Sequence, residues 1–284
     1  LDALYEIQAD VTLENVYSLL LDERDMDETL RDLGNIYPTE RRRALIDHFK
    51  NRYLNQPSEQ IGGVRETIAN YLQYFLTPEI AQVFCTDANT FEFDEIDRGK
   101  IICVAMPQKF QTERRYVNTC LKMLFYTHVL RRFDKPKSER KDANLLILWA
   151  DEAQRFMTAS EDGMSDYNSI DVIREAGATV VAAAQSSTSF IPPLGREKAK
   201  VLTLNLRNRL IFKAADEEGA VESADFLGTR KCVKRSWGYS AGRSSRHYSE
   251  PEEHKTKPYT LRALPTPPCI LVPVVPGGLI PHVS

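Results

Sequence analysis

The sequence contains no long hydrophobic run, which argues against a membrane-spanning helix within it. Such a helix needs about 20 consecutive apolar residues, whereas the longest apolar stretches are Leu145–Ala150, Val180–Ala184 and the proline-broken Cys269–Val275. The five cysteines are odd in number and lack metal-ligand spacing, so we expect free thiols in a reducing compartment. The net charge of only −3 excludes a chain that coats nucleic acid or membrane over its whole surface, although local basic patches remain compatible with it.

What is present is the composition of an ordinary globular protein. The chain has 284 residues, of which 42% are hydrophobic and 27% charged, enough for one large domain or two modest ones. It begins with leucine and shows no secretory signal, so we expect it to be a piece of a longer protein.

Residues 1–90 show the pattern of an all-helical domain. Helix starts are indicated at Thr12, Pro38-Thr39 and Thr77-Pro78, where a capping side chain or a proline precedes apolar residues at helical spacing. Gly34 is expected to end one of these helices, and Gly62-Gly63 to break the chain before another. Nothing in this part of the sequence alternates with period two.

Residues 91–284 alternate between expected strands and helices, which indicates an α/β domain with a mostly parallel sheet covered on both faces. Short apolar runs predict strands at residues 100–107, 145–150, 178–186 and 208–214. Helical periodicity predicts helices at residues 113–133, 165–177, 196–206 and 216–228. The domains expected are therefore 1–90, all helical, and 91–284, α/β.

Two acidic residues follow the strand expected at 145–150. Ligands of open α/β sheets bind at the carboxyl ends of the strands, where this sequence places Asp151 and Glu152. In a site that splits a phosphoanhydride, Asp151 would orient the Mg²⁺ shell and Glu152 would polarise the attacking water. Gln185 follows the next strand, and a neutral amide there would sense the terminal phosphate and hold that water. The alternative for the two acids is a solvated strand end or a helix N-cap.

Three arginines lie near the strand expected at 208–214. Arg207 and Arg209 stand at its entrance, and Arg174 lies in the preceding segment VIREAG. An arginine from a neighbouring subunit can neutralise charge on a transferring phosphoryl group, an effect of roughly 10³–10⁵ in rate. We expect one of the three to act in this way, and the alternative for each is a surface or salt-bridge role.

A polar, basic and serine-rich segment spans residues 229–258. Its first part, 229–248, contains no acid, and aromatic side chains are interleaved with its cations. Cations bind backbone phosphates and aromatic rings stack on bases. Candidate nucleic-acid contacts are Arg235, Trp237, Arg243 and Arg246. The alternative is a flexible surface loop between strands.

The order and spacing of several segments resemble a known family, the conjugative or type IV secretion coupling ATPases (TraG/TraD-like, within the FtsK/HerA-type P-loop superfamily). The matching segments are FEFDEIDRGKIICVAMP, LLILWADEAQRF, IREAGATVVAAAQSSTSF, NLRNRLIFKAADEEGAVESADFLG and KRSWGYSAGRSSRHYS before LRALPTPPCIL. Together they cover about residues 91–275.

The resemblance implies the C-terminal portion of a RecA-like P-loop ATPase core, preceded by an inserted all-helical domain. It implies an ATP- and Mg²⁺-dependent DNA translocase that forms a hexameric ring and delivers DNA or nucleoprotein to a type IV secretion channel. Relaxase or other transfer proteins would be partners, and a separate segment would anchor this cytoplasmic part in a bacterial inner membrane. By the same resemblance Asp151 and Glu152 match the Walker B pair, Gln185 the sensor glutamine, and Arg207 or Arg209 the arginine finger.

The sequence departs from this family in lacking a phosphate-binding loop. That loop requires the pattern G-x-x-x-x-G-K-[ST] directly after a strand. The one Gly-Lys pair, Gly99-Lys100, has Asp94 in place of the first glycine and Ile101 in place of the hydroxyl residue. We therefore expect the loop and the membrane anchor to lie upstream of Leu1, and we predict that this chain alone hydrolyses no ATP.

Two alternative functions remain at this stage. A non-catalytic module could bind DNA or relaxosome proteins through its helical domain and turn over no nucleotide. A superfamily 2 helicase fits less well: DEAQ matches its acidic box, but the Ser-Ala-Thr tripeptide of that class is absent.

Overall fold

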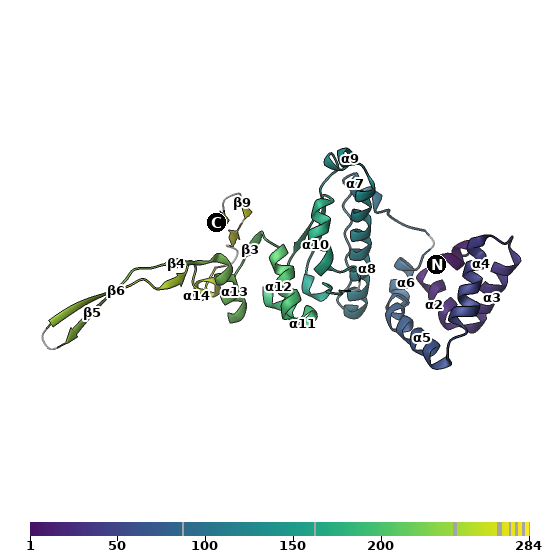
Figure 1. The fold of residues 1–284 in the computed structure, drawn as a ribbon, viewed down its shortest axis with the longest axis horizontal. Helices are drawn as coiled ribbons and strands as arrows, with labels where there is room; N and C mark the ends of the chain where they lie inside the picture. The colour runs from purple at the N-terminus through teal and green to yellow at the C-terminus, as the bar shows by residue number, and fades with distance from the viewer. Residues whose placement is uncertain are drawn as a thin grey trace. The chain divides into compact units, whose positions relative to one another are not determined.

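The structure is a computed structural model of the 284-residue chain (Figure 1). It describes residues 1–86, 88–161, 163–240, 243–265, 269–272, 274–275, 278–279 and 282–283. The chain divides into two compact units, Leu1–Leu124 and Phe125–Ser284, and each has its own hydrophobic core. The domain boundary near residue 90 that the sequence suggests stays a prediction.

The elements of the first unit are helices, which the sequence predicts for residues 1–90. Its elements are α1 (Asp2–Glu6), α2 (Leu13–Leu21), α3 (Glu23–Asn35), α4 (Glu40–Asp47), the π-helix η1 (His48–Tyr53), α5 (Ser58–Leu72), η2 (Gln73–Phe75), α6 (Pro78–Phe84), α7 (Asp94–Asp97) and the first part of α8 (Gln111–Leu130). The expected caps are confirmed: the Thr12 hydroxyl accepts a hydrogen bond from the Asn15 amide at 3.1 Å, and Thr39 accepts one from Arg42 at 3.2 Å. Buried side chains of α1, α2 and α3 form one hydrophobic cluster.

Three details of the sequence prediction are wrong in this unit. Gly62 and Gly63 lie inside α5, which runs through them because an interior glycine costs only about 1 kcal/mol relative to alanine. Gly34 lies one residue before the end of α3 and does not terminate it. The strand expected at 100–107 does not form, and Ile101 is 90% exposed. A strand requires a hydrogen-bonded neighbour, and among the described strands none pairs with this segment.

The second unit alternates strands and helices. After the end of α8 it contains η3 (Arg131–Asp134), α9 (Lys137–Lys141), β1 (Leu146–Ala150), η4 (Ala153–Arg155), α10 (Asp166–Glu175), β2 (Ala178–Ala182), η5 (Ser187–Phe190), α11 (Ile191–Leu194), α12 (Arg196–Asn205), β3 (Arg209–Ile211), α13 (Glu217–Leu227), β4 (Thr229–Lys231), β5 (Lys234–Ser240), β6 (Arg243–Ser249), β7 (Glu252–His254), α14 (Pro258–Arg262), β8 (Ile270–Val272), β9 (Val274–Val275), β10 (Gly278–Leu279) and β11 (His282–Val283). The order strand, helix, strand from β1 to α13 confirms the α/β pattern.

The parallel sheet is confirmed in one pair of strands. β1 and β2 run parallel, with Leu146 opposite Ala178 and Ala150 opposite Ala182. β3 pairs in antiparallel fashion with β8, which also pairs with β11. Within the described residues β3 therefore belongs to a second, antiparallel sheet, and the mostly parallel sheet stays a prediction beyond β1 and β2.

One face of β1 is uncovered. Leu146 and Ala150 are buried, whereas Ile147 is 56% exposed and Trp149 is 72% exposed. Thr179, which pairs with Ile147 on the neighbouring strand, is exposed as well. The expectation of a sheet covered on both faces is thus wrong for the part of the chain that the structure describes.

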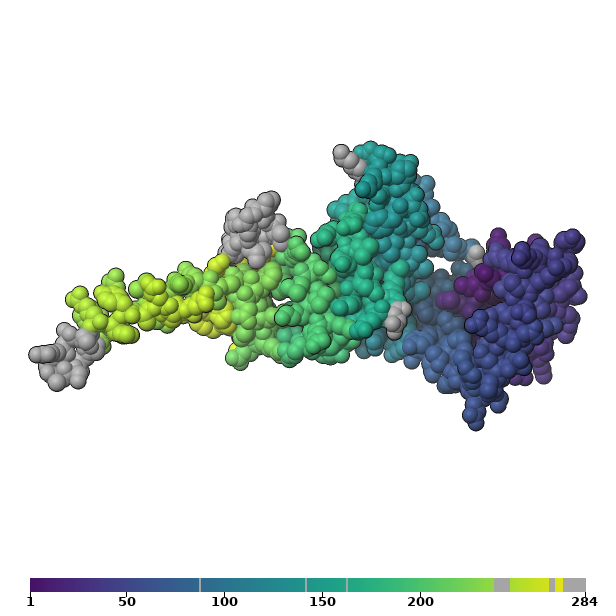
Figure 2. Space-filling view, in the orientation of Figure 1, coloured from purple at the N-terminus to yellow at the C-terminus, as the bar shows by residue number. Residues whose placement is uncertain are grey.

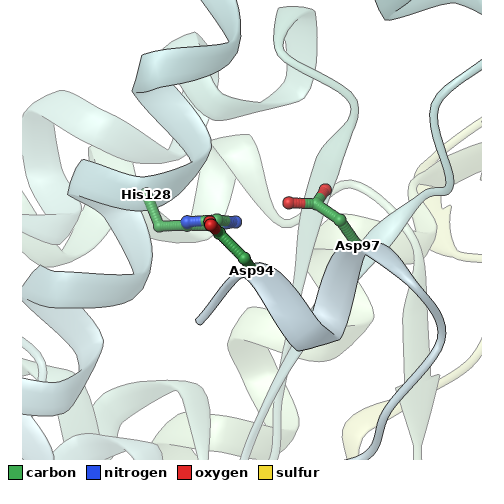
Figure 3. A group of neighbouring side chains, drawn as sticks. All are labelled: Asp94, Asp97 and His128. Atoms are coloured by element: carbon green, nitrogen blue, oxygen red, sulfur yellow. The ribbon is translucent and has the colours of Figure 1, made fainter. Parts of the chain in front are cut away.

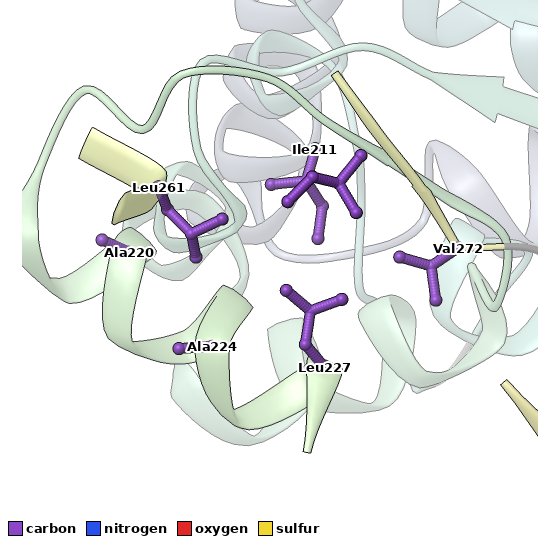
Figure 4. Close-up of a cluster of buried hydrophobic side chains, with 7 residues drawn as sticks. Ile211, Ala220, Ala224, Leu227, Leu261 and Val272 are labelled. Atoms are coloured by element: carbon purple, nitrogen blue, oxygen red, sulfur yellow. The ribbon is translucent and has the colours of Figure 1, made fainter. Parts of the chain in front are cut away.

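A compact core holds β3 against the last helices of the unit. Ile211, Ala220, Ala224, Leu227, Leu261, Ile270 and Val272 form this cluster, which joins β3, α13, α14 and β8 (Figure 4). The five cysteines are free, as expected. No helix within the described ranges is long and apolar enough to cross a membrane.

The basic segment after α13 forms strands and is not the flexible loop that was one of its two expected states. β4 pairs with β7, and β5 pairs with β6, both in antiparallel register (Figure 1). Among the described strands β5 and β6 pair only with each other, so they form a two-stranded ribbon.

Candidate active site

The carboxyl ends of β1 and β2 lie side by side. Their pairing continues past the strands, because the Ala183 amide donates to the Ala150 carbonyl at 2.8 Å and the Ala153 amide donates to the Ala183 carbonyl at 2.9 Å. Asp151 and Glu152 follow β1 and lie between the bonded residues Ala150 and Ala153, and Gln185 follows β2, two residues beyond Ala183. The fold therefore brings the two acids and the amide to one edge of the sheet.

Glu152 has an unusual backbone conformation. Its φ of 51° and ψ of 42° lie in the left-handed region, which non-glycine residues seldom adopt. Such a conformation costs of order 1–3 kcal/mol and persists where the surroundings impose it, often at functional sites. Here the next residue, Ala153, is held in place because its backbone amide donates to the Ala183 carbonyl on the neighbouring segment. The extended backbone of β1 therefore ends before this left-handed residue.

The two carboxylates have different partners. One Asp151 oxygen accepts a hydrogen bond from the Glu152 amide at 3.0 Å, and the residue is otherwise exposed. One Glu152 carboxylate oxygen accepts hydrogen bonds from the side-chain amide of Gln154 and from the Arg155 guanidinium, each at 3.0 Å. Hard carboxylate oxygens open to solvent suit Mg²⁺, which keeps most of its waters and takes few protein ligands. Asp151 is thus the residue at this edge that fits a magnesium ligand.

Gln185 lies in a turn that neighbouring side chains hold in place. The next residue, Ser186, accepts a hydrogen bond from the Thr188 amide at 3.3 Å, and the Ser187 hydroxyl donates to Glu222 of α13 at 2.6 Å. A Cβ atom at Gly219 would lie 2.3 Å from the Ser186 hydroxyl oxygen. A side chain at position 219 would therefore displace the Ser186 hydroxyl, and the bond from Ser187 to Glu222 links α13 to the turn that carries the exposed Gln185.

A buried polar network supports the loop that leaves this edge. The Tyr126 hydroxyl donates to Asp166 at 2.5 Å, and the Thr158 amide donates to the other Asp166 oxygen at 2.7 Å. Tyr126 and Asp166 are both fully buried. Burial, and after it the Asp166 carboxylate, raises the pKa of the Tyr126 hydroxyl. Because buried polar groups need their partners, the network ties the loop after η4 to α8 and α10. No motif in the sequence indicates it.

A buried arginine holds the opposite ends of the same strands. The Arg132 guanidinium donates to the carbonyls of Ala176 at 3.1 Å, Gly177 at 3.2 Å and Asn144 at 3.0 Å. These carbonyls end α10 and precede β2 and β1. Arg132 is 4% exposed, so it fixes the starts of both strands from inside the unit.

The three candidate finger arginines occupy two different environments. Arg174 and Arg207 are exposed and line one pocket together with Thr179 at the amino end of β2. Among the described residues neither forms an ion pair. That pocket lies at the end of β2 opposite to Asp151 and Gln185.

Arg209, in contrast, is engaged within its own unit. Its guanidinium lies 3.8 Å from the centre of the Phe226 ring and donates to the Thr203 carbonyl at 3.1 Å. Burial lowers the pKa of Arg209, and the nearby Glu222 carboxylate opposes this effect.

The candidate nucleic-acid residues lie on the β5–β6 ribbon. Arg235 pairs with Tyr248 across the strands, and Trp237 pairs with Arg246. The side chain of Arg243, which is paired with Ser240 in the backbone register, lies outside the described residues.

Asp94 and Asp97 project from the one-turn helix α7, and His128 projects from α8 (Figure 3). Each takes part in an interaction within the structure. α7 belongs to the first compact unit and His128 to the second, and we assign no metal site to these residues.

Comparisons with known proteins identify related sequences and structures for most of the chain. The sequence profile of the type IV secretion-system coupling protein DNA-binding domain matches residues 2–263. A search of curated proteins found no matching sequence.

Solved structures of a bacterial conjugative coupling protein share this fold. The unbound form of TrwBdeltaN70 has a TM-score of 0.61 and 17% identity, covering 91% of this chain and 58% of that chain. TrwB bound to the ATP analogue ADPNP has a TM-score of 0.58 and 17% identity, covering 91% and 57%. TrwB bound to ADP and Mg²⁺ gives the same four values.

This chain therefore spans less than two thirds of the length of these relatives. The family profile, in contrast, extends over most of the chain's own length. The chain belongs to the family of type IV secretion-system coupling protein DNA-binding domains.

Proposed function

We propose that this chain is part of an ATP-driven DNA translocase, a coupling protein that delivers DNA or nucleoprotein to a conjugation or type IV secretion channel. The observation that carries the proposal is the convergence of Asp151, Glu152 and Gln185 at one carboxyl edge of the β1–β2 pair. The carboxyl ends of neighbouring parallel strands are where α/β proteins bind nucleotides. The ligands of the TrwB structures, ADPNP and ADP with Mg²⁺, support ATP and Mg²⁺ as the cofactors here.

Each residue of the edge has a distinct role in this proposal. Asp151 orients the water shell of Mg²⁺ with its solvent-exposed carboxylate. Glu152 accepts hydrogen bonds from the attacking water and aligns it for in-line displacement. Gln185 places its amide beside the terminal phosphate and the same water. When bound, Mg²⁺ supplies charge neutralisation at the phosphate oxygens.

The uncovered face of β1 supports a site completed by another segment of a RecA-like core. Ile147 and Trp149 present apolar side chains to solvent at 56% and 72% exposure. Among the described strands β1 pairs only with β2, so its other edge is open for a further strand. An uncovered apolar face of this kind marks an interaction surface. We place the phosphate-binding loop on a segment that packs here and is not among these 284 residues.

A ring of identical subunits would use Arg174 or Arg207 as its arginine finger. Both side chains are exposed at a pocket beside the amino end of β2, opposite to the carboxyl end where Asp151 lies. A finger that acts on a neighbour's nucleotide has to be free of its own subunit's core. Arg209 stacks on Phe226 and meets this requirement less well. A hexamer, a relaxase partner, and a cytoplasmic position at the inner membrane complete the proposal.

The test is ATP hydrolysis by the intact protein with DNA present. Glu152→Gln should lower the rate by about 10²–10⁴-fold, because the amide aligns water poorly, while binding of ADPNP and Mg²⁺ persists. Glu139→Gln, at an exposed position of α9, serves as the control and should retain full activity. Full activity of the Glu152→Gln variant would refute the assignment of this edge.

The second candidate function is a non-catalytic module that binds DNA or relaxosome proteins. The basic β5–β6 ribbon favours this second function, since DNA binding by the ribbon would not require bound ATP. The two functions differ in one result: a non-catalytic module gives DNA binding but no DNA-stimulated hydrolysis in the intact protein.

A further inference from the structure

One face of the β5–β6 ribbon carries two crossed pairs of arginine and aromatic side chains. In an antiparallel pair, directly opposed residues share a face, and so do residues two apart on one strand. The register therefore places Arg235, Trp237, Arg246 and Tyr248 on the same face. The Arg246 guanidinium lies 4.5 Å from the centre of the Trp237 ring, and that of Arg235 lies 5.7 Å from the Tyr248 ring.

The rings on this face remain open to solvent. Trp237 is 67% exposed and Tyr248 is 56% exposed, although each ring has a guanidinium beside it. In the space-filling view the described atoms of this part of the chain form a narrow projection (Figure 2). Exposed aromatic rings that alternate with cations along a strand form the kind of surface on which unpaired bases stack.

The cations at the base of the ribbon have acidic partners, whereas those that the structure describes further along it do not. At its base Lys234 forms an ion pair with Glu253, and Lys257 approaches the same carboxylate at 3.6 Å. Within the part of the ribbon that the structure describes, neither Arg235 nor Arg246 forms an ion pair. No acidic residue occurs between positions 229 and 249. The uncompensated cations thus lie beside the exposed rings, and an anionic polymer is the complementary partner.

We propose that this face binds single-stranded DNA, with bases stacked on Trp237 and Tyr248 and phosphates bound by Arg235 and Arg246. The two crossed pairs are two residues apart along each strand, or about 7 Å, so each ring has room to stack on a separate unpaired base. Duplex DNA offers no free base faces to these rings. The proposal rests on the proposed function in DNA transfer and specifies the state of the DNA at this surface.

The test compares single-stranded and duplex oligonucleotides of equal length bound to the full chain. Trp237→Ala should weaken binding of the single strand about tenfold or more and of the duplex less than threefold. Arg246→Ala should weaken single-strand binding and reduce its salt dependence by about one phosphate contact. Arg131→Ala, at an exposed position of η3 outside the ribbon, removes the same charge and should change neither affinity by more than about twofold.

Arg243 provides a test of the face itself. The backbone register places it on the side of the ribbon opposite Arg246, so Arg243→Ala should cause a smaller loss than Arg246→Ala. Equal losses would show a non-specific charge effect and overturn the proposal. Equal losses for single-stranded and duplex DNA in Trp237→Ala would overturn it too. So would loss of binding to phosphatidylserine vesicles in Trp237→Ala with unchanged DNA affinity.

Tryptophan fluorescence gives a second measurement that does not depend on the affinity of a variant. The chain has two tryptophans, so in Trp149→Phe the emission comes from Trp237 alone. Single-stranded DNA should quench this emission by stacking, and duplex DNA should leave it nearly unchanged. Quenching by neither would reject the stacking role. DNA binding that is unchanged by substitutions in the ribbon would reject only this inference. Absence of any DNA binding would reject the proposed function itself.

Discussion

The carboxyl edge of β1 and β2 and the β5–β6 ribbon both carry functional candidates, but they are held in different ways. Around the two strands of that edge, the side chains of Tyr126, Asp166 and Arg132 are buried and hydrogen-bonded. The ribbon is held by its own cross-strand bonds and by exposed contacts such as that of Arg246 with Trp237. A site that aligns water for reaction requires fixed positions, whereas a surface that follows a flexible polymer does not. The difference predicts where substitutions will destabilise the fold.

The largest expected effect on stability is at Arg132. Arg132→Met should lower the free energy of unfolding by about 3 kcal/mol, because three backbone carbonyls lose the charged donor that a buried guanidinium supplies. Arg131→Met, at the exposed neighbouring position, should stay within about 0.5 kcal/mol. Urea unfolding of both variants measures the difference. Equal effects would show that the guanidinium bonds contribute nothing special.

A smaller loss is expected at Tyr126. Tyr126→Phe keeps the ring but leaves the buried Asp166 carboxylate without one donor, which should cost about 1–3 kcal/mol. Thermal unfolding is the measurement, with Tyr259→Phe as the control because Tyr259 is 68% exposed. An unchanged midpoint for Tyr126→Phe would contradict the supporting role of this network.

Arg155 tests the edge without removing its acids. Its guanidinium bonds Glu152 at 3.0 Å in an exposed pair, an interaction worth about 1 kcal/mol or less. Arg155→Ala should therefore raise the basal ATP hydrolysis of the intact protein by at most about fivefold, because the Glu152 carboxylate is released to accept water. Arg196→Ala breaks a comparable exposed pair with Glu218 and should leave the rate unchanged. A strong decrease in Arg155→Ala would instead assign Arg155 a part in hydrolysis.

The smallest effect on stability is expected in the ribbon. Trp237→Ala removes an exposed cation–π contact, which contributes about 0.5–1 kcal/mol. The free energy of unfolding of the whole chain should fall by no more than this amount in urea. A loss as large as that of Tyr126→Phe would mean that the ribbon is part of the folded core, and the comparison between the two regions would fail.

Features that depend on local sequence, such as helix N-caps and the positions of the first three strands, are predicted correctly. Thr12 and Thr39 cap the helices expected of them, and β1, β2 and β3 form where short apolar runs stand. The caps are predictable because they depend on residues that are near in the sequence, and the three strands because apolar runs fit a pleated, half-buried surface.

Long-range packing is what the sequence does not reveal. The run at 100–107 has the composition of a strand, yet strand formation depends on a neighbour that no local pattern reports. The left-handed backbone of Glu152 depends in the same way on the neighbouring Ala183 segment.

For the ribbon, the missed signal was present. Aromatic and basic residues alternate with period two on either side of Ala241-Gly242, a pattern that favours a hairpin. Tyr126, Asp166 and Arg132 carry no such pattern, since their partners lie 40 or more residues away, apart from Thr158 and Asn144.

The central claim is that the edge of β1 and β2 is the hydrolytic part of a motor whose phosphate-binding part lies on another segment. The most direct test measures Mg²⁺-dependent ATP hydrolysis by these 284 residues alone and by the intact protein, with and without DNA. We predict no turnover by the isolated chain and DNA-stimulated turnover by the intact protein. Appreciable turnover by the isolated chain, or none by the intact protein in the presence of DNA, would contradict the claim.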